Sequence, residues 1–411
     1  KHEVPIVLDP VGCHAGAYRL SVVLDLIKTG DISLLRGNQS EIKAIYDALS
    51  PNNQIDTSTT GKGVDGVQVE DSAVMTYRLA RLINCPVVAT GEEDYVSDGT
   101  RIFAVPHGHP IMTAVTGTGC LLGAVLAAFF SAYQPCKNTL SIGEFLAYAL
   151  AYYGLAGESA VQVSGVKPGS FSVAFMDSLY TLDDTMLVSE NRIRPIVVPD
   201  QLQVYFVCGT QDTGLNKKRL LEIVEEACRG GVTCFQFREK GDGTLEGQQK
   251  LELAQQLQHI CAKYYVLFIV NDDVELAVAV NADGVHVGQD DMRLEDVRHL
   301  VGHKVVGISI HSVEELRKTD VVYADCVGVG PMYATSSKPD AQEPCGPERI
   351  SELQAKGLTL PCVGIGGITL DNTRVVLRAG ACGVAVISAI AHAEKPYEAT
   401  RQFKQLVSNS Q

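Results

Sequence analysis

The sequence predicts an α/β protein with two domains, an open α/β sheet followed by a closed (β/α)₈ barrel. The first reason is length, because 411 residues are too many for one ordinary hydrophobic core. The second is the alternation of β-branched apolar runs with helical periodicity through both halves. A stretch with Pro195 and Pro199 separates the two patterned regions. We therefore place one domain at 1–187, a linker at 188–202 and a second domain at 203–411.

The second region contains eight short apolar runs that have the composition of buried strands. They are Val204–Cys208, Cys234–Glu239, Leu267–Asp272, Gly284–Gly288, Val305–Ile310, Cys326–Met332, Pro361–Gly366 and Gly383–Ser388. Segments with helical periodicity lie between them, such as Lys217–Cys228 and Glu246–Tyr264. Eight strands alternating with eight helices predict a (β/α)₈ barrel. The alternative is an open, doubly wound sheet with extra strands.

The first region has the pattern of an open α/β sheet. Pro5–Asp9, Leu34–Arg36 and Pro86–Thr90 are predicted parallel strands, and Gly119–Ala132 is a predicted buried helix. The chain runs from Lys1 almost directly into the first of these strands. We therefore expect the opening units of this domain to precede Lys1.

Composition excludes several classes of partner. The formal net charge is −14 and no lysine- or arginine-rich run occurs, which argues against nucleic acid or an anionic membrane as a partner. Twelve cysteines are present without a C-x-x-C spacing, which predicts a reducing, cytoplasmic compartment and neither a zinc site nor a disulfide framework. The longest nearly apolar run, Cys120–Tyr133, is too short to cross a bilayer.

Charged side chains follow the second predicted strand of the barrel. Alternation along the strand places Gln236, Arg238 and Lys240 on one side. Two cations beside an amide donor suit an anionic ligand, because they can hold its oxygens at fixed positions. The alternative is a solvated, charged loop without a ligand.

Two carboxylates follow the next two strands. Asp272 and Asp291 are about one β/α unit apart, so both reach the same end of the barrel. Mg²⁺ between these carboxylates and a diphosphate would explain acidic side chains opposite two cations. Asp272 could instead cap the helix that begins near Val274. Asp290 remains an alternative to Asp291 as the ligand.

The remaining strand ends are polar or rich in glycine. Ser309 ends the fifth strand, and the loop 330–338 contains hydroxyl groups and one lysine. The glycine-rich segment 364–368 ends the seventh strand, and 386–388 ends the eighth. Backbone N–H groups at these two positions form the usual phosphate site of such barrels. His286 alternates within its strand and is expected to pack or to orient a neighbour.

The second region resembles thiamine phosphate synthase over nearly its whole length. The motifs that carry the resemblance are QFREK, FIVNDD, ADGVHVGQDDM, GISIH, GVGPMYATSSK, GIGGI and GVAVISAI. By this resemblance, hydroxymethylpyrimidine diphosphate is held by Gln236, Phe237, Arg238, Glu239, Lys240, Asn271, Ser309 and Lys338. Mg²⁺ is bound by Asp272 and Asp291. The thiazole phosphate is held by Thr335, Ser337, Gly367, Ile387 and Ser388. Ser337 departs from the second threonine usual in that family but keeps the hydroxyl group.

The reaction that these residues favour is dissociative. Arg238, Lys240 and Lys338, together with Mg²⁺, would stabilise the departing diphosphate and leave a pyrimidinylmethyl cation. The thiazole nitrogen would then attack that cation. No strong general base is required, and none is evident.

A glycine-rich segment precedes the apolar helix of the first region. Successive N–H groups in Val115–Cys120 could stabilise a transferring phosphoryl group. Cys120 lies at the helix N-terminus, where a thiolate is favoured and could act on a substrate hydroxyl. Alternatively, Cys120 is a small buried residue beside a tight turn.

The first region resembles hydroxyethylthiazole kinase, which has a ribokinase-like fold. The matching motifs are LDPVG, LLRGNQSEI, VVATGEEDYVSDG, GHPIMTAVTGTGC and VKPGSFSVAFMDSLY. The resemblance implies that Arg36 and Thr90 contact ATP and that Asp9 and Glu41 lie on the Mg²⁺ side. It also implies that Gly117 touches the thiazole and that Cys120 is the catalytic base. Asp9 and Glu41 could each instead be a helix cap.

Together the two resemblances predict consecutive steps of thiamine biosynthesis, because the kinase product is a substrate of the synthase. The expected partners are small molecules: hydroxymethylpyrimidine diphosphate, hydroxyethylthiazole, its phosphate and ATP. A homo-oligomer is also expected. Two alternatives remain, a barrel similar to a thiazole tautomerase and a kinase half that serves only as an oligomerisation scaffold.

Overall fold

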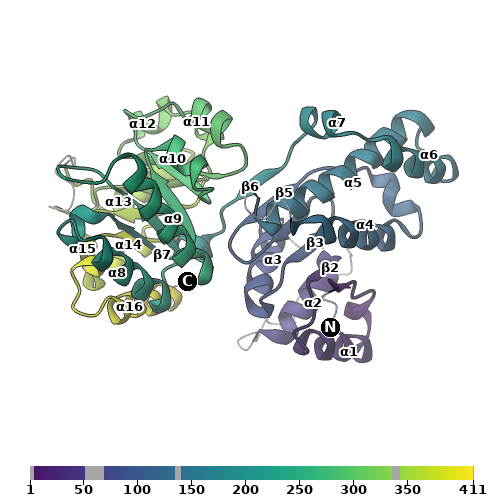
Figure 1. Ribbon diagram of the computed structural model, residues 1–411, viewed down its shortest axis with the longest axis horizontal. Coiled ribbons are helices and arrows are strands. Elements are labelled where there is room, and N and C mark those ends of the chain that lie inside the picture. The colour runs from purple at the N-terminus through teal and green to yellow at the C-terminus, as the bar shows by residue number, and fades with distance from the viewer. Residues whose placement is uncertain (1–3, 51–68, 135–139, 336–342, 411) are drawn as a thin grey trace. The chain divides into compact units, whose positions relative to one another are not determined.

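The computed structural model describes residues 4–50, 69–134, 140–335 and 343–410. The chain divides into two compact units, Lys1–Ile196 and Val197–Gln411. In Figure 1 the first unit runs from purple to teal and the second from teal to yellow. No helix in the described ranges combines the length and the apolar content needed to cross a membrane.

The first unit contains, within its described residues, a six-stranded mixed sheet in the order β1-β2-β3-β4-β5-β6. β1, β2 and β3 pair in parallel, which confirms the three predicted parallel strands. β4, β5 and β6 extend the sheet in antiparallel pairs that the sequence pattern did not predict. The strands are β1 (Val7–Leu8), β2 (Leu34–Asn38), β3 (Val87–Thr90), β4 (Asp94–Ser97), β5 (Ile102–Val105) and β6 (Arg194–Ile196).

Helices cover both faces of this sheet, and alternation along the strands supplies a core for each face. Leu34 and Val88 pack toward α4, α5 and α6, whereas Leu35 and Val87 pack toward α1, α2 and α3. Figure 1 shows α4 and α5 on one side of β2 and β3, and α1 and α2 on the other. The helices are α1 (Ala17–Lys28), α2 (Gln39–Leu49), α3 (Val69–Ile83), α4 (Thr118–Ala132), α5 (Ile142–Ser164), α6 (Pro168–Thr181) and α7 (Asp184–Ser189), with 3₁₀ turns η1 (Cys13–Ala15) and η2 (Pro110–Ala114).

The described strands of the second unit close a parallel barrel in the order β7-β8-β9-β10-β11-β12-β13-β14 and back to β7. The closure confirms the predicted (β/α)₈ barrel and excludes the open sheet. The strands are β7 (Val204–Cys208), β8 (Cys234–Phe237), β9 (Leu267–Asn271), β10 (Gly284–Val287), β11 (Val305–Ile310), β12 (Cys326–Val329), β13 (Cys362–Ile365) and β14 (Gly383–Val386).

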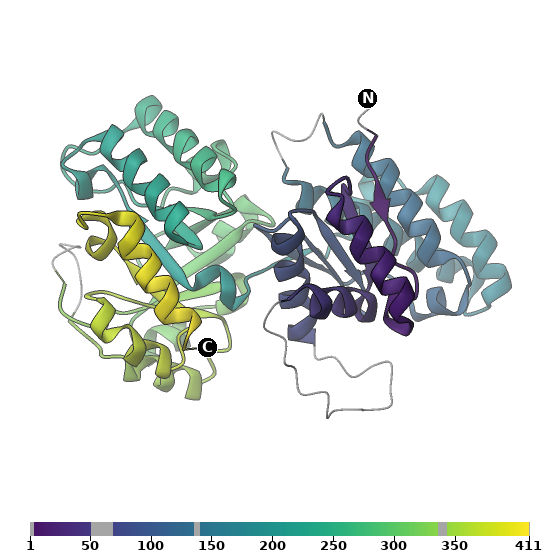
Figure 2. The ribbon, with the colours of Figure 1, turned by 90° about the horizontal axis from the view of Figure 1, so that it is seen from below.

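Helices form the outer layer of the barrel, and a short extra helix, α15, follows the last strand. In Figure 2 the final helix, α16, lies across the outside of the barrel in yellow. The helices are α8 (Lys217–Gly230), α9 (Gly247–Lys263), α10 (Val274–Ala279), α11 (Leu294–Val301), α12 (Val313–Lys318), α13 (Glu348–Ala355), α14 (Leu370–Arg378), α15 (Ser388–Ala391) and α16 (Pro396–Ser408), with 3₁₀ turns η4 (Pro199–Leu202), η5 (Thr210–Thr213) and η6 (Val321–Tyr323).

The inside of the barrel changes character along its axis. Toward the amino ends of the strands it is filled by apolar side chains, among them Cys234, Leu267 and Cys326. Two residues further along β8 the inward side chain is Gln236, which is buried, and β10 similarly presents His286. Apolar side chains therefore fill one end of the barrel. Polar side chains line the other end, where the catalytic groups of this fold lie.

The segment 188–202, predicted to be a linker, contains the strand β6 and the 3₁₀ turn η4. Arg194–Ile196 forms β6 and pairs with β5 of the first sheet. Val197 and Leu202 are buried in the core inside the barrel. The apolar side chains between the two prolines have sheet and core partners.

Candidate active sites

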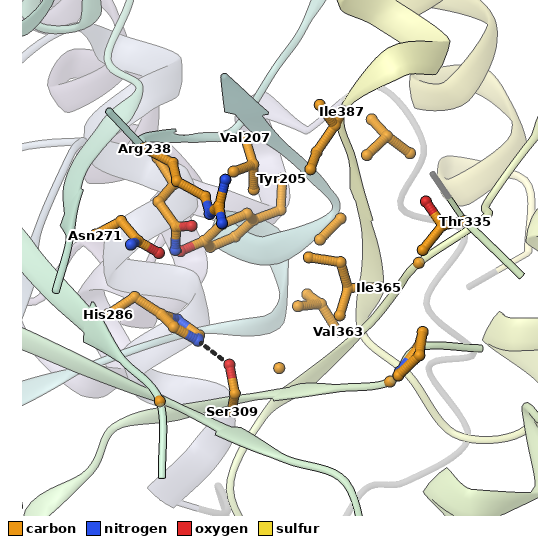
Figure 3. Close-up of a pocket in the computed structure, with 18 of the residues that line it drawn as sticks. Tyr205, Val207, Arg238, Asn271, His286, Ser309, Thr335, Val363, Ile365 and Ile387 are labelled. Carbon is orange, nitrogen blue, oxygen red and sulfur yellow. Dashed lines mark hydrogen bonds between the residues drawn. The ribbon is translucent and has the colours of Figure 1, made fainter. Parts of the chain in front are cut away.

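A pocket of about 260 Å³ opens at the carboxyl ends of the barrel strands. Figure 3 shows side chains from β7 to β11 on one side of it and Thr335, Ile365 and Ile387 on the other. The described residues of the predicted synthase site that line it are Gln236, Arg238, Lys240, Asn271, Asp272, Asp291, Ser309, Thr335, Gly367, Ile387 and Ser388. Ser337 and Lys338, which were also predicted, lie outside the described residues.

The β8 end carries the cations, in the alternating arrangement that the sequence predicted. The Gln236 amide donates to the hydroxyl of Tyr205 at 3.0 Å. Arg238 is buried, whereas Lys240 is half exposed, with its Nζ 2.9 Å from Asp272 Oδ2. The hydrogen bond and the charge of Asp272 raise the pKa of Lys240.

Asp272 is held in a conformation that aspartate seldom adopts. Its φ is 61°, in the left-handed region, and such outliers are common at functional sites. The following residue, Asp273, caps α10 by accepting from the N–H of Leu276 at 3.0 Å. Asp273 is therefore the N-cap residue of α10, a role that was considered for Asp272. The Asp272 carboxylate lines the pocket.

The carboxylates of Asp272 and Asp291 are adjacent. Burial raises the pKa of Asp272, its hydrogen bond to Lys240 lowers it, and the charge of Asp291 raises it again. Asp291 Oδ2 also accepts from the N–H of Gly288 at 2.7 Å, which fixes its position. Asp290 lines the same pocket, but Asp291 is the carboxylate that acts on both Asp272 and Lys240.

These carboxylates fit Mg²⁺, which commonly takes one or two protein carboxylates and completes its shell with phosphate oxygens and water. The described part of the chain contains no group of three or more histidine, cysteine, aspartate or glutamate side chains that could hold a metal ion. Two adjacent carboxylates suit an ion that is bound together with a phosphorylated substrate.

Backbone groups form the opposite side of the pocket. Gly366 and Gly367 both have positive φ, 96° and 62°, in the turn after β13. A Cβ at Gly367 would lie 2.6 Å from the carbonyl oxygen of Ala334, so only glycine fits. Gly366, Gly367, Ile387 and Ser388 all line the pocket, and successive backbone N–H groups in turns of this kind commonly bind phosphate.

Several pocket residues were not predicted as site residues or had only a general role, among them Tyr205, His286 and His311. Tyr205 follows from the alternation in β7, because it points inward and contacts Gln236. His286 Nε2 lies 3.1 Å from Ser309 Oγ, so His286 has the predicted orienting position (Figure 3). His311 lines the pocket with its Nδ1 2.9 Å from the Glu315 carboxylate.

Two predicted ligands, Phe237 and Glu239, do not line the pocket formed by the described residues. Phe237 is 1% exposed and packs in the core between the strands and the outer helices. The Glu239 carboxylate accepts from the N–H groups of Thr210 and Leu245, both at 2.9 Å. Alternation explains the difference, because both side chains point away from the side that Arg238 and Lys240 share.

In the first unit, Arg36 joins two of the predicted residues. Its Nη1 donates to Asp9 Oδ2 at 3.0 Å and its Nη2 to Thr90 Oγ1 at 3.2 Å. Burial raises the pKa of Asp9, and the charge of Arg36 opposes that shift. Asp9 Oδ1 and Arg36 Nε are buried without a hydrogen-bond partner among the described residues, which is uncommon for buried polar atoms.

Glu41 takes part in the N-terminal cap of α2, a role that was considered for it from the sequence. Its Oε1 accepts from the N–H of Gly12 and its Oε2 from the N–H of Asn38, both at 2.8 Å. Asn38 in turn accepts from the N–H of Glu41, which completes a capping box at the start of α2. Glu41 therefore connects the segment after β1 to the end of β2, close to Asp9.

The glycine-rich segment forms the start of α4, as predicted. Gly117, with φ 99°, is the N-cap residue, and Cys120 lies exposed in the first turn. The exposure argues against a buried, structural role for Cys120. A Cβ at Gly119 would lie 3.5 Å from the Arg36 guanidinium, so the helix start and Arg36 are neighbours. Tyr153 supports this turn, since its hydroxyl donates to the carbonyl of Thr118 at 2.6 Å.

The geometry defines a barrel enzyme with a site for phosphorylated ligands, and a mixed-sheet unit whose glycine-rich helix start suits phosphoryl transfer. Residues 204–390 match the thiamine monophosphate synthase family, and residues 1–185 match the hydroxyethylthiazole kinase family. The chain therefore belongs to the bifunctional proteins of thiamine biosynthesis, in which hydroxyethylthiazole kinase precedes thiamine phosphate synthase.

Two curated relatives agree with this assignment. The thiamine-phosphate synthase of Geobacillus thermodenitrificans is 53% identical over 205 residues, which are 50% of this chain and 91% of the relative. The thiamine biosynthesis bifunctional protein ThiM/ThiE of Symbiobacterium thermophilum is 36% identical over 407 residues, 98% of this chain and 80% of the relative. Among solved structures, thiamine phosphate pyrophosphorylase from Pyrococcus furiosus is 31% identical with a TM-score of 0.45, covering 52% of this chain and 98% of that one.

These matches confirm both resemblances noted in the sequence, and they favour a synthase over a tautomerase-like barrel. Thiamine phosphate synthase and hydroxyethylthiazole kinase are the two enzymes joined in this chain. Membership in the kinase family also implies ATP as the phosphoryl donor of the first unit.

Proposed function

We propose that the barrel pocket joins hydroxymethylpyrimidine diphosphate to hydroxyethylthiazole phosphate and releases diphosphate. The observation that carries the proposal is the cluster of Lys240, Asp272 and Asp291 beside the buried Arg238. Fixed cations next to paired carboxylates suit a diphosphate bound together with Mg²⁺, whereas either charge alone would not.

In this proposal Arg238, Lys240 and Asn271 bind and orient the diphosphate. The bond between the methylene carbon and the diphosphate oxygen breaks, and its electron pair leaves with the diphosphate. Mg²⁺, held by Asp272 and Asp291 when bound, would supply positive charge to those oxygens. The guanidinium of Arg238 is already desolvated, so it interacts strongly with charge that develops nearby.

The thiazole phosphate would occupy the other side of the pocket. Its phosphate would accept hydrogen bonds from the backbone near Gly367 and Ser388 and from the hydroxyl of Thr335. Figure 3 shows Thr335 and Ile387 across the pocket from Arg238 and Asn271. The thiazole nitrogen would then face the methylene carbon and form the new C–N bond, a step that depends on positioning.

We propose that the first unit phosphorylates the hydroxyl of hydroxyethylthiazole. Arg36 and Thr90 would contact ATP, Asp9 would lie on the Mg²⁺ side, and Gly117 would touch the thiazole. Cys120 would take the hydroxyl proton. The support is the convergence of Arg36, Asp9 and the start of α4. In this arrangement Glu41 acts indirectly, because it holds the segment after β1 through the N–H of Gly12.

A coupled assay tests the barrel proposal. With both phosphorylated precursors and Mg²⁺, the protein should form thiamine phosphate and diphosphate in equal amounts. Omission of either precursor or chelation of the metal should stop both products. Conversion of a thiazole without diphosphate release would support the tautomerase-like alternative and contradict the proposal.

We also propose that the protein is a homo-oligomer. On α6, Val173, Met176 and Tyr180 lie on one helical face and are 65%, 55% and 91% exposed. Contiguous exposed apolar side chains of this kind commonly mark an interface. Light scattering coupled to size exclusion should give a mass above one chain; a single-chain mass at micromolar concentration would contradict this expectation.

A further inference from the structure

We propose that Glu239 is a positioning residue which, with η5, clamps the backbone that carries Arg238 and Lys240. The inference rests on the proposed diphosphate site and names the part of the chain that gives that site its geometry. The clamp consists of Glu239 on one side and Gly209, Thr210 and Gln211 on the other.

The Glu239 carboxylate connects two loops. Its Oε2 accepts from the N–H of Thr210 at 2.9 Å, and its Oε1 accepts from the Thr210 hydroxyl. Oε1 also accepts from the N–H of Leu245 at 2.9 Å, in the loop that leads to α9. Both oxygens are thus engaged with the protein's own donors, and the side chain lies outside the described pocket lining.

η5 contacts the same backbone from the other direction. Gln211 Nε2 donates to the carbonyl of Arg238 at 2.7 Å, and the Arg238 N–H donates to the carbonyl of Cys208 at 3.0 Å. A Cβ at Gly209 would lie 1.9 Å from the Arg238 carbonyl oxygen, which no other residue could accommodate. Asp212 orients Gln211 by accepting from its Nε2 at 2.8 Å.

The need for such a clamp follows from where β8 ends. The pairing of β8 with β7 ends with Phe237 and the N–H of Arg238, so the peptide units from the Arg238 carbonyl to Lys240 lie beyond the regular ladder. Free loops are mobile, and small displacements of positioning groups reduce rates strongly. Glu239 and η5 hold these peptide units in place. The side chains of Arg238 and Lys240, which are two residues apart, therefore both point into the pocket.

A direct contact between Glu239 and the substrate is a weaker explanation. A third carboxylate beside a diphosphate would repel it, unless Mg²⁺ lay between them. Glu239 instead lies outside the pocket lining that includes Asp272 and Asp291, and it accepts three hydrogen bonds from N–H and O–H donors. The charge of Glu239 thus serves the loop and not the ligand.

The test is the variant Glu239→Gln, which keeps the shape of the side chain. Whichever way its amide is turned, the NH₂ group faces an N–H of Thr210 or Leu245, so one hydrogen bond is lost and a repulsive contact replaces it. We expect the KM for the pyrimidine diphosphate to rise about 10-fold or more while the KM for the thiazole phosphate stays within about 2-fold. Glu222→Gln, an exposed change on α8, is the matched control and should leave both values unchanged.

Two measurements that need no turnover complete the test. Hydrogen exchange should become faster in the segments 209–216 and 240–247 of the Glu239→Gln variant, because both loops lose an anchor. Titration with inorganic diphosphate and Mg²⁺ should show weaker binding than in the unmodified protein. If the unmodified protein lacked synthase activity, the proposed function would fail, yet these two measurements would still decide whether the clamp exists.

A second pair of variants covers the case in which Glu239→Gln fails to fold. Thr210→Val removes the hydroxyl donor and should reproduce the change in KM, whereas Thr210→Ser keeps the hydroxyl and should restore it. Unchanged exchange and unchanged diphosphate binding in the folded variants would overturn the proposal. Equal losses for both substrates would also overturn it, because they would indicate a general structural defect.

Discussion

Replacement of Asp272 or Asp291 with alanine should lower the rate of thiamine phosphate formation by at least about 10²-fold, the size of effect seen when a key charge stabiliser is lost. The two carboxylates are adjacent, and Asp272 is paired with Lys240 at 2.9 Å. Loss of either carboxylate would leave Mg²⁺ with one protein ligand and would unbalance the charge around the diphosphate. The measurement is the initial rate of product formation at saturating precursors over a range of Mg²⁺ concentrations.

Asp290→Ala is the matched control for this experiment. Asp290 lines the same pocket and is the neighbour of Asp291 in sequence, but its carboxylate is not the one that acts on Asp272. We expect the Asp290 variant to retain near-normal turnover. An inactive Asp290 variant beside an active Asp291 variant would show that the ligand assignment is wrong.

The barrel could be predicted from sequence because its strands are short, buried on both faces and regularly spaced. Val204–Cys208 and Val305–Ile310 have the observed bounds, since both runs are mainly apolar and both begin and end on a buried residue. The other predicted strands extended one to three residues too far at an end, as Cys326–Met332 did. In Cys326–Met332 the apolar pattern continues after the ladder has stopped, because loop residues such as Met332 are also buried.

The antiparallel part of the first sheet could not be predicted by the same reasoning. β4 and β5 have four residues each, and β6 consists of Arg194–Ile196, which contains a proline. Proline is compatible with an edge strand, and β6 is at the edge of the described sheet. Its pairing with β5 joins segments about ninety residues apart, so no local pattern indicates it.

The site was predictable wherever alternation along a strand decides which side chains point inward. Gln236, Arg238 and Lys240 are in the pocket for this reason. The prediction of Glu239 as a ligand came from resemblance to a continuous motif, and the structure gives that side chain partners in η5. The distinction between Asp272 and Asp273 as the helix cap depends on the local φ, which sequence alone does not reveal.

Cys120→Ala should reduce phosphorylation of hydroxyethylthiazole while the coupling of supplied thiazole phosphate remains unchanged. A positioned base is worth about 10²–10⁴ in rate, so a loss in that range is expected for the kinase step. Cys120 is exposed in the first turn of α4, and Arg36 lies beside the start of that helix. It belongs to the unit Lys1–Ile196, whereas the synthase pocket lies within the unit Val197–Gln411.

The two activities should be measured on the same preparation, as ADP release with free thiazole and as thiamine phosphate formation from both phosphorylated precursors. Cys85→Ala, at a buried thiol of the first unit, is the control for a general effect of removing a sulfur atom. A parallel fall of both activities in the Cys120 variant would show that the two sites do not work independently, and full kinase activity would remove Cys120 from the mechanism.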